Sequence, residues 1–228
     1  MSVIKTQNIS RIYSETKVPV HALNGVSLEI NEGEFTAIVG PSGSGKSTLL
    51  NIIGGLDSPT SGSVEVGGQD ISMLSENQLI DFRLRNIGFV FQSYNLIPVL
   101  TAKENVEFIM LLQKRDKHEM VKRAAELLER VGLGDRQNNR PSELSGGQQQ
   151  RVAVARALAS NPRFILADEP TANLDSQSTA NLLDLMADMN KNENATFVFS
   201  THDQRVIDKA RRVITLEDGK IVSDEVRA

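Results

Sequence analysis

A glycine-rich loop, Gly40-Pro-Ser-Gly-Ser-Gly-Lys-Ser47, has the clearest potential for chemistry in this sequence. It fits the pattern G-x-x-x-x-G-K-[ST], follows a mostly apolar run at 34–39 and precedes a predicted helix at 46–56. The glycines let successive backbone N–H groups point inward, and the helix start adds partial positive charge. This context disfavours the alternative of a plain glycine turn with an exposed lysine. We therefore predict a nucleotide site made of Gly40, Pro41, Ser42, Gly43, Ser44, Gly45, Lys46, Ser47 and Thr48.

Two adjacent acids, Asp168 and Glu169, follow the apolar run 164–167. In open α/β sheets, ligands bind at the carboxyl ends of the strands. Asp168 and the Ser47 hydroxyl are therefore expected to hold Mg²⁺, while Lys46 neutralises phosphate oxygens. Glu169 is expected to act as general base on the attacking water, or to orient it. Two acids that merely end a strand in solvent are the alternative, which the upstream phosphate loop disfavours.

Two more polar residues follow predicted strands in the same manner. His202 comes after 196–200, and Gln92 comes after 87–91. We expect His202 to sense or stabilise the terminal phosphate, and Gln92 to reach Mg²⁺ or the attacking water. A structural histidine and an ordinary polar loop residue are the alternatives.

A second possible anion site, Ser145-Gly-Gly-Gln148, opens a predicted helix. A serine and two glycines at a helix start expose N–H donors and a hydroxyl. The nucleotide is already cradled by 40–48, so this second set has no evident ligand in its own chain. Two copies that meet head to tail could complete each other's sites, giving a dimer around two ATP molecules. The alternative is a glycine-rich helix cap without chemical meaning.

The elements around these residues alternate between strands and helices, which indicates an α/β fold with a largely parallel central sheet. Strands at 3–13 and 26–30, with a turn at 14–20 between them, give an antiparallel region at the N-terminus. Residues 93–160 are nearly all helical in pattern. We predict one nucleotide-binding domain, 1–228, whose α/β core (1–92 and 161–228) carries 93–160 as an inserted all-helical subdomain.

The composition of the chain argues against several classes of partner and chemistry. Lys and Arg number 25 against 29 Asp and Glu, a net charge of -4, so nucleic acid is not an expected partner. The chain has no cysteine, which excludes thiolate chemistry and disulfides. The apolar runs, such as 108–112, fall short of the ~20 residues that span a bilayer. A membrane role is therefore expected to come through a partner.

Together these motifs resemble the nucleotide-binding domain of ATP-binding cassette (ABC) transporters, with a P-loop NTPase core, over essentially the whole chain. The resemblance implies ATP hydrolysis, with Mg²⁺, in an ATP-sandwiched dimer that drives an integral-membrane permease from the cytoplasmic face of the membrane. It implies that Tyr13 stacks on adenine, that Gln92 is the Q-loop residue and that Ser145, Gly146, Gly147 and Gln148 form the signature. Glu169 would be the catalytic acid, Asp175 the D-loop acid and His202 the switch histidine.

The segments 87–98, 140–147 and 166–175 resemble one subgroup, the lipoprotein-release, macrolide-export and antimicrobial-peptide-resistance cassettes. Ala172 stands where many close relatives have glycine, a mild departure. We expect an ATPase that powers export or extrusion. The alternative is a non-transporting mechanotransmission or signalling ATPase of the cell-division or peptide-sensing type. A DNA-repair or translation ATPase is disfavoured, because the chain has neither a long inserted coiled coil nor a second cassette. Glu169 argues against a sensor that does not hydrolyse ATP.

An apolar loop at 94–100 and the apolar run 108–112 suggest where a permease would bind. We predict that they form a groove that receives a short cytoplasmic helix of the permease, with Leu96 and Ile97 as contact residues. The alternative is that these side chains only build the core of the helical subdomain.

Overall fold

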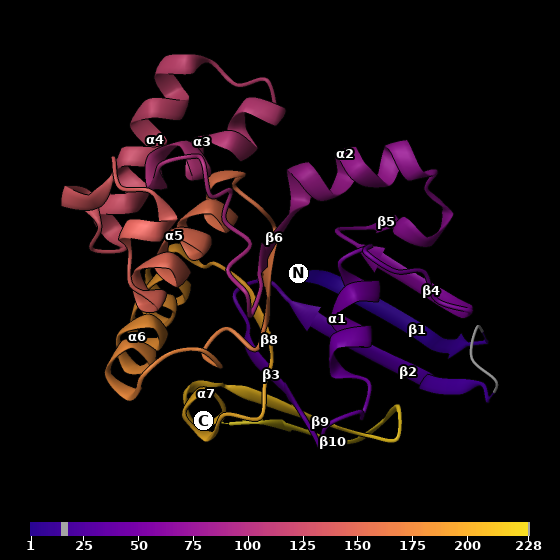
Figure 1. Cartoon of the computed structure of the whole chain (residues 1–228). Helices are drawn as coiled ribbons and strands as arrows, with labels where there is room; N and C mark the ends of the chain where they lie inside the picture. The colour runs from indigo at the N-terminus through magenta and orange to yellow at the C-terminus, as the bar shows by residue number, and fades with distance from the viewer. Residues whose placement is uncertain (15–17, 228) are drawn as a thin grey trace.

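The fold is built on two β-sheets that differ in strand direction (Figure 1). The structure, a computed structural model, describes residues 1–14 and 18–227, so the predicted turn at 14–20 lies partly outside the described residues. One sheet has four strands in the order β2-β1-β4-β5, and the other has six in the order β10-β9-β3-β8-β7-β6. The strands are β1 (Ser2–Tyr13), β2 (Val20–Asn31), β3 (Phe35–Val39), β4 (Ser61–Val66), β5 (Gln69–Asp70), β6 (Ile87–Val90), β7 (Phe164–Asp168), β8 (Phe197–Ser200), β9 (Arg212–Glu217) and β10 (Lys220–Val226).

The six-stranded sheet is the part that positions the site. Strands β6, β7, β8, β3 and β9 are parallel, and only β10 pairs antiparallel. Strands β3, β7 and β8 are buried along almost their whole length, as expected for strands covered on both faces. The four-stranded sheet is antiparallel throughout. The predicted α/β class, with a mostly parallel sheet and an antiparallel N-terminal region, is confirmed.

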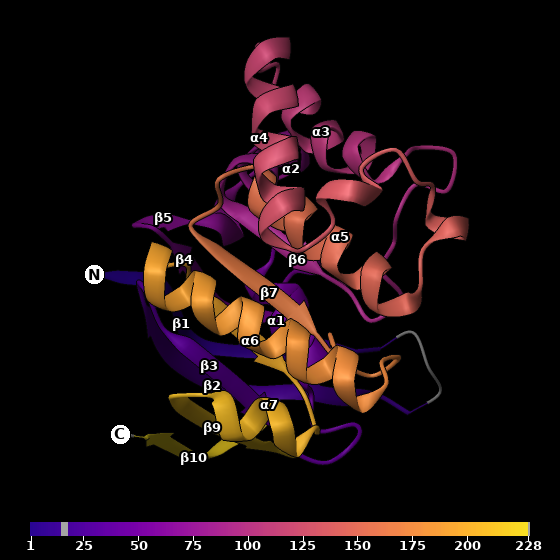
Figure 2. The ribbon, with the colours of Figure 1, turned by 90° about the vertical axis from the view of Figure 1, so that its left-hand side faces the viewer.

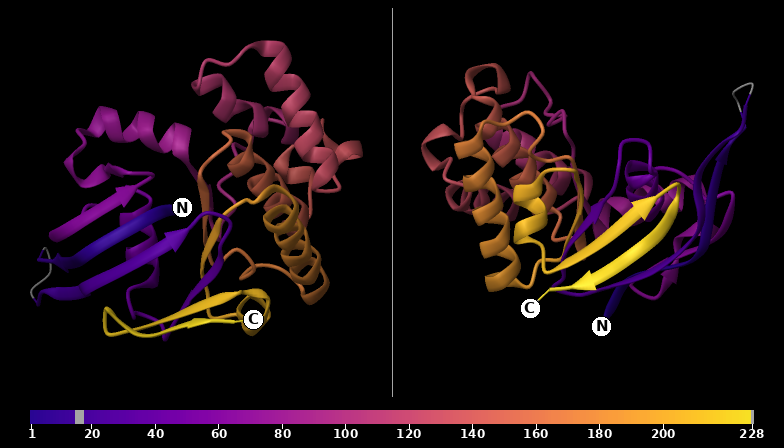
Figure 3. Two further views of the ribbon diagram at one scale, coloured as in Figure 1. Left: turned by 180° about the vertical axis from the view of Figure 1, so that it is seen from behind. Right: turned by 90° about the horizontal axis from the view of Figure 1, so that it is seen from below.

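Helices cover both faces of the six-stranded sheet (Figure 2). They are α1 (Lys46–Ile53), α2 (Glu76–Asn86), α3 (Ala102–Leu112), α4 (Lys117–Arg130), α5 (Gly146–Ala159), α6 (Ser176–Glu193) and α7 (Gln204–Lys209), with short 3₁₀ turns at Ile71–Met73, Gly134–Arg136 and Pro141–Glu143. Alternate residues of β7 face opposite cores. Phe164 and Leu166 pack with α1 and the four-stranded sheet, whereas Ile165 and Ala167 pack with α5 and α6. Helix α1 therefore lies between the two sheets (Figure 3).

Residues 93–160 hold α3, α4, α5, two 3₁₀ turns and loops, in line with the predicted helical segment. Their buried side chains share one continuous core with α6 and the near face of the six-stranded sheet. The division into a core and a subdomain stays a prediction.

Local capping signals were reliable guides to where helices begin. Ser75 with Gln78 and Thr101 with Glu104 have the capping-box spacing in the sequence, and they form capping boxes at the starts of α2 and α3. Helix α4 begins at Lys117, because the Asp116 side chain accepts hydrogen bonds from the N–H groups of His118 and Glu119. Within the described residues, the structure has no helix of the length and apolarity that a membrane span requires.

Candidate nucleotide-binding and hydrolysis site

The glycine-rich loop joins β3 to α1 and curls around the Lys46 amine. Gly40, Gly43 and Gly45 have positive φ angles of 147°, 81° and 101°. The Lys46 Nζ atom donates hydrogen bonds of 2.9 Å to the carbonyl oxygens of both Gly40 and Pro41. The ammonium group is therefore held inside the loop, at the N-terminus of α1, where anions are favoured.

Two of these glycines leave no room for a side chain. A Cβ atom at Gly40 would lie 2.0 Å from the Leu216 carbonyl oxygen, and one at Gly45 would lie 2.3 Å from that of Ala22. The Ser44 hydroxyl is buried and has no hydrogen-bond partner within the described part of the chain. An unpaired buried hydroxyl, a lysine amine and a helix N-terminus in one loop fit a polyphosphate.

Ser47 and Asp168 lie together, although 121 residues separate them in sequence. The Ser47 hydroxyl donates a 3.1 Å hydrogen bond to Asp168 Oδ1. A hydroxyl and a carboxylate are oxygen ligands suited to Mg²⁺, which usually takes one or two protein groups and completes its shell with phosphate oxygens and water. The described residues contain no cluster of three or more His, Cys, Asp or Glu side chains that could hold a metal alone. This donor set therefore fits a Mg²⁺ ion that arrives with a nucleotide.

Glu169 and His202 form the most defined polar pair at the carboxyl edge of the sheet. Glu169 Oε1 lies 2.8 Å from His202 Nδ1, and Thr201 Oγ1 lies 3.5 Å from Glu169 Oε2. The Glu169 backbone has a φ of 46°, and its N–H donates to the Ser200 carbonyl oxygen at 2.9 Å. The glutamate side chain is 18% exposed, whereas the histidine is 75% exposed. A carboxylate partly shielded from water and paired with an imidazole is suited to proton transfer.

Gln92 follows β6 and is exposed. Because β6 and β7 pair in parallel, Gln92 emerges at the same sheet edge as Asp168 and Glu169. Its carbonyl oxygen accepts a 3.0 Å hydrogen bond from Asn173 Nδ2.

Tyr13 is the last residue of β1 and contacts the ion pair of Arg11 and Asp57. Its hydroxyl donates to Asp57 Oδ2 at 2.8 Å, and the Arg11 guanidinium stacks 4.5 Å from the ring centroid. Arg11 also pairs with Asp57 at 2.8 Å. These contacts fix the ring at the strand end, and its stacking on adenine stays a prediction.

The Ser145-Gly-Gly-Gln148 segment caps α5 and packs against the start of α6. Ser145 and Gln148 form a capping box, and a Cβ atom at Gly147 would lie 2.8 Å from Ser178 Oγ. Asp175 accepts hydrogen bonds from the N–H (2.9 Å) and hydroxyl (2.6 Å) of Ser178, and these bonds lower the pKa of its carboxyl. Within the described residues, no hydrogen bond joins 145–148 to the loop 40–48.

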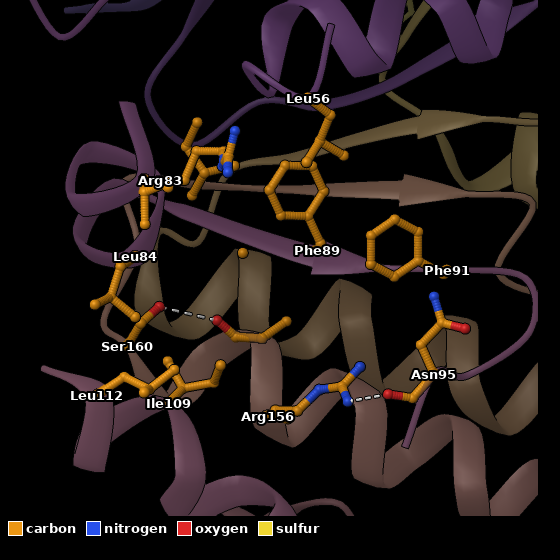
Figure 4. Close-up of a pocket in the computed structure, with 14 residues that line it drawn as sticks. Leu56, Arg83, Leu84, Phe89, Phe91, Asn95, Ile109, Leu112, Arg156 and Ser160 are labelled. Carbon is orange, nitrogen blue, oxygen red and sulfur yellow. Dashed lines mark hydrogen bonds between the residues drawn. The ribbon is translucent and has the colours of Figure 1, made fainter. Parts of the chain in front are cut away.

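An apolar groove of about 500 Å³ lies between α2, β6, α3 and α5 (Figure 4). Asn95, Ile109 and Leu112 line it, as the predicted segments suggested, but Leu96 and Ile97 do not. Leu96 packs against the core, and the backbone of Ile97 bonds to the Asn105 side chain. No sequence pattern indicated the rest of the lining, which is made by Leu56, Ile80, Arg83, Leu84, Ile87, Gly88, Phe89, Phe91, Arg156, Ala157 and Ser160.

Comparisons with known proteins agree with this geometry. A family model described as ABC transporter matches residues 23–172. An ABC transporter ATP-binding protein of Thermotoga maritima is 50% identical over 225 residues, which cover 99% of this chain and 96% of that protein. A macrolide export ATP-binding/permease protein, MacB, of Mannheimia succiniciproducens is 45% identical over 98% of this chain, which spans 35% of that longer protein. The solved structure of the ATP-binding cassette MJ0796, described as a dimeric post-hydrolysis state bound to ADP and Pi, is 45% identical, covers 99% of both chains and has a TM-score of 0.91.

Proposed function

The chain belongs to the ABC transporter family, and from that premise we propose how its residues hydrolyse ATP. The predicted family and the predicted lipoprotein-release and macrolide-export subgroup are confirmed, and the chain is an ABC-type ATPase. The observation that carries the mechanism is the Glu169–His202 pair, held at 2.8 Å at the sheet edge where Asp168 accepts a hydrogen bond from Ser47 of α1.

Residues 40–48 hold the phosphates of ATP in this proposal. Lys46 neutralises β- and γ-phosphate oxygens, and the inward N–H groups of the loop bind the remaining oxygens. Tyr13 stacks on the adenine. Ser47, Asp168 and Gln92 would hold Mg²⁺, which when bound would supply positive charge to neutralise the phosphates.

Glu169 takes the proton of the attacking water, or orients that water toward the γ-phosphate. His202 keeps the Glu169 carboxylate in place through Nδ1 and presents the other end of its ring to the terminal phosphate. The 2.8 Å contact supports this division of roles, because it engages Oε1, whereas Oε2, which lies 3.5 Å from Thr201 Oγ1, can still accept a hydrogen bond from the water.

The second phosphate contact comes from another copy of the chain. Ser145, Gly146, Gly147 and Gln148 of one copy cover the γ-phosphate bound by the other, and Asp175 lies beside that contact. The exposed Ser145 at the start of α5 supports this arrangement, as does the similar cassette MJ0796, which is described as dimeric.

In this proposal the apolar groove is the binding site for a segment of the permease at the cytoplasmic face of the membrane. It is lined by large apolar side chains, among which Ile80 and Leu112 are 54% and 49% exposed. Apolar surface of this kind marks a partner site. The similar MacB proteins are named as joint ATP-binding and permease proteins, which favours a transporter over the signalling alternative.

Replacement of Glu169 by Gln tests the proposal. The amide keeps the shape but cannot accept the proton, so we expect ATP turnover to fall by about 100-fold or more. ATP should then hold two copies together, which a sizing column run with and without ATP will detect. Lys46→Ala should abolish nucleotide binding and the dimer with it. Turnover at the wild-type rate in the Glu169→Gln variant would contradict the assigned base.

A further inference from the structure

Gln150 is a fully buried glutamine that joins the two strand ends of the proposed site. It lies on α5 and is 0% exposed. Its Nε2 atom donates to the Pro170 carbonyl oxygen at 2.8 Å and to that of Phe91 at 3.4 Å. Pro170 directly follows Glu169, and Phe91 directly precedes Gln92. One amide therefore spans the backbone beside both residues.

The other half of this amide is unsatisfied. Gln150 Oε1 is buried without a hydrogen-bond partner in the part of the chain that the structure describes. An unpaired buried acceptor destabilises the fold, and an apolar side chain of similar length would fill the same space without that acceptor. The contribution of Gln150 therefore lies in its two donated bonds.

The segment that follows Phe91 is held from the same helix and from residue 173. Asn173 Nδ2 donates to the Gln92 carbonyl oxygen at 3.0 Å. The Arg156 guanidinium donates to the carbonyl oxygens of Tyr94 (2.9 Å) and Asn95 (2.5 Å), the second of which is visible in Figure 4. Tyr94 and Asn95 have φ angles of 57° and 50°, in the left-handed region, which is unfavourable for a bulky residue such as Tyr94. Side-chain donors outside 91–95 therefore hold four of its carbonyl groups, those of Phe91, Gln92, Tyr94 and Asn95.

We propose that Gln150 is a positioning residue that fixes the spacing between Gln92 and Glu169. It acts through the backbone of their neighbours and touches no substrate. Since α5 begins at the Ser145 cap, a shift of this helix moves the Gln92 segment and the Glu169 turn together. The inference rests on the proposed function, because it assigns Gln150 to the geometry of that same site.

Gln150→Met removes both donors and keeps the length of the side chain. We expect kcat for ATP hydrolysis to fall about 10- to 100-fold, because small displacements of catalytic groups have effects of this size. KM for ATP should change by less than about twofold, since the phosphate loop is untouched.

Gln113→Met is the matched control. Gln113 is also buried, donates from Nε2 to two carbonyl oxygens (Leu84 at 2.9 Å and Ser160 at 3.1 Å) and has an unpartnered Oε1. Its bonds lie away from the acids. Both Met variants should lower the free energy of unfolding, measured in urea, by similar amounts. Only Gln150→Met should lower kcat, and an equal loss in both variants would overturn the proposal.

Gln150→Glu adds a readout that a merely structural role would not move. A protonated acid can still donate to Pro170, whereas the carboxylate cannot, and burial raises the pKa of such an acid. Its kcat relative to wild type should therefore rise as pH falls. If the ratio of the Gln150→Glu kcat to the wild-type kcat does not change with pH, the proposal is overturned. It is also overturned if the double variant Gln150→Met, Glu169→Gln loses the ATP-dependent dimer that Glu169→Gln forms.

The two proposals can fail separately. Rapid ATP turnover by Glu169→Gln refutes the proposed function, whereas an inactive Glu169→Gln together with a fully active Gln150→Met refutes only this inference.

Discussion

Glu169 Oε1 and His202 Nδ1 lie 2.8 Å apart although 33 residues separate them in sequence. The reason is the strand order. Strands β7 and β8 are parallel neighbours in which Asp168 pairs with Ser200, so the residues after both strands leave the sheet at one edge. The N–H of Glu169 also donates to the Ser200 carbonyl oxygen, which extends the pairing by one residue.

His202→Ala removes the partner of Glu169 and leaves the phosphate loop intact. We expect kcat for ATP hydrolysis to fall about 100-fold, with a KM for ATP close to that of the wild type. Steady-state phosphate release over a range of ATP concentrations measures both values. His118→Ala, an exposed histidine in the first turn of α4, is the control and should hydrolyse ATP as the wild type does.

Two glycines of the phosphate loop should differ in their tolerance of alanine. Gly40→Ala places a Cβ atom 2.0 Å from a backbone oxygen, whereas Gly43→Ala meets no atom within 4 Å and is disfavoured only by its φ of 81°. A positive φ lowers the free energy of unfolding of an alanine variant by about 1–2 kcal/mol. At Gly40 the clash with the backbone oxygen adds to this loss. Urea unfolding should show a larger loss of stability for Gly40→Ala. Equal losses would mean that the loop relaxes freely around Gly40.

Much of the site could be predicted because its signals are local. The phosphate loop and the two capping boxes each lie within a few consecutive residues, so their chemistry is visible in the sequence. The acids, Gln92 and His202 follow apolar strands, and a parallel sheet brings such ends together.

The groove was predicted only in part, because its walls come from distant segments. Leu56, Ile80 and Phe89 meet Ile109 and Leu112 through tertiary packing alone. Leu96 is as apolar as these residues but packs into the core, a choice that composition cannot reveal. Gln150 was equally hidden, since nothing in a run of three glutamines singles out the buried one.

Contacts of Arg212 with two carboxylates should make the free energy of unfolding depend on pH. It bonds to Glu34 at 2.9 Å and to Asp224 at 2.7 and 2.8 Å. Burial alone would raise the pKa of Glu34, but hydrogen bonds from Asn31, Thr36 and Arg212 outweigh it and lower the pKa. The hydrogen bonds from Arg212 also lower the pKa of Asp224.

Carboxyl groups whose pKa is lower in the folded than in the unfolded state stabilise the fold above their unfolded pKa. That stability is lost as pH falls through the folded values, in the range below the ordinary pKa of each carboxyl. Arg212→Met should lower the free energy of unfolding at neutral pH by about 1–3 kcal/mol and flatten its fall in acid, as measured by urea unfolding from neutral to acidic pH. Arg85→Met, which breaks an exposed pair with Asp81, should cost less than about 1 kcal/mol. An unchanged acid profile for Arg212→Met would contradict the assignment.

A charge in the groove should separate hydrolysis from coupling to the membrane. Leu112→Glu puts a carboxylate beside Ile109 and the other apolar residues of a lining that also includes Arg83 and Arg156, and a charged side chain is costly to bury beneath an apolar partner. We expect the variant to bind ATP normally but to be lost from membranes of cells that express it in place of the wild type. Leu111→Glu is a matched control, because Leu111 is adjacent, 57% exposed and absent from the groove lining. Membrane fractionation followed by immunoblotting compares the two. Retention of Leu112→Glu at the wild-type level would place the permease contact elsewhere, whereas loss of both variants would mean that the contact extends beyond the groove.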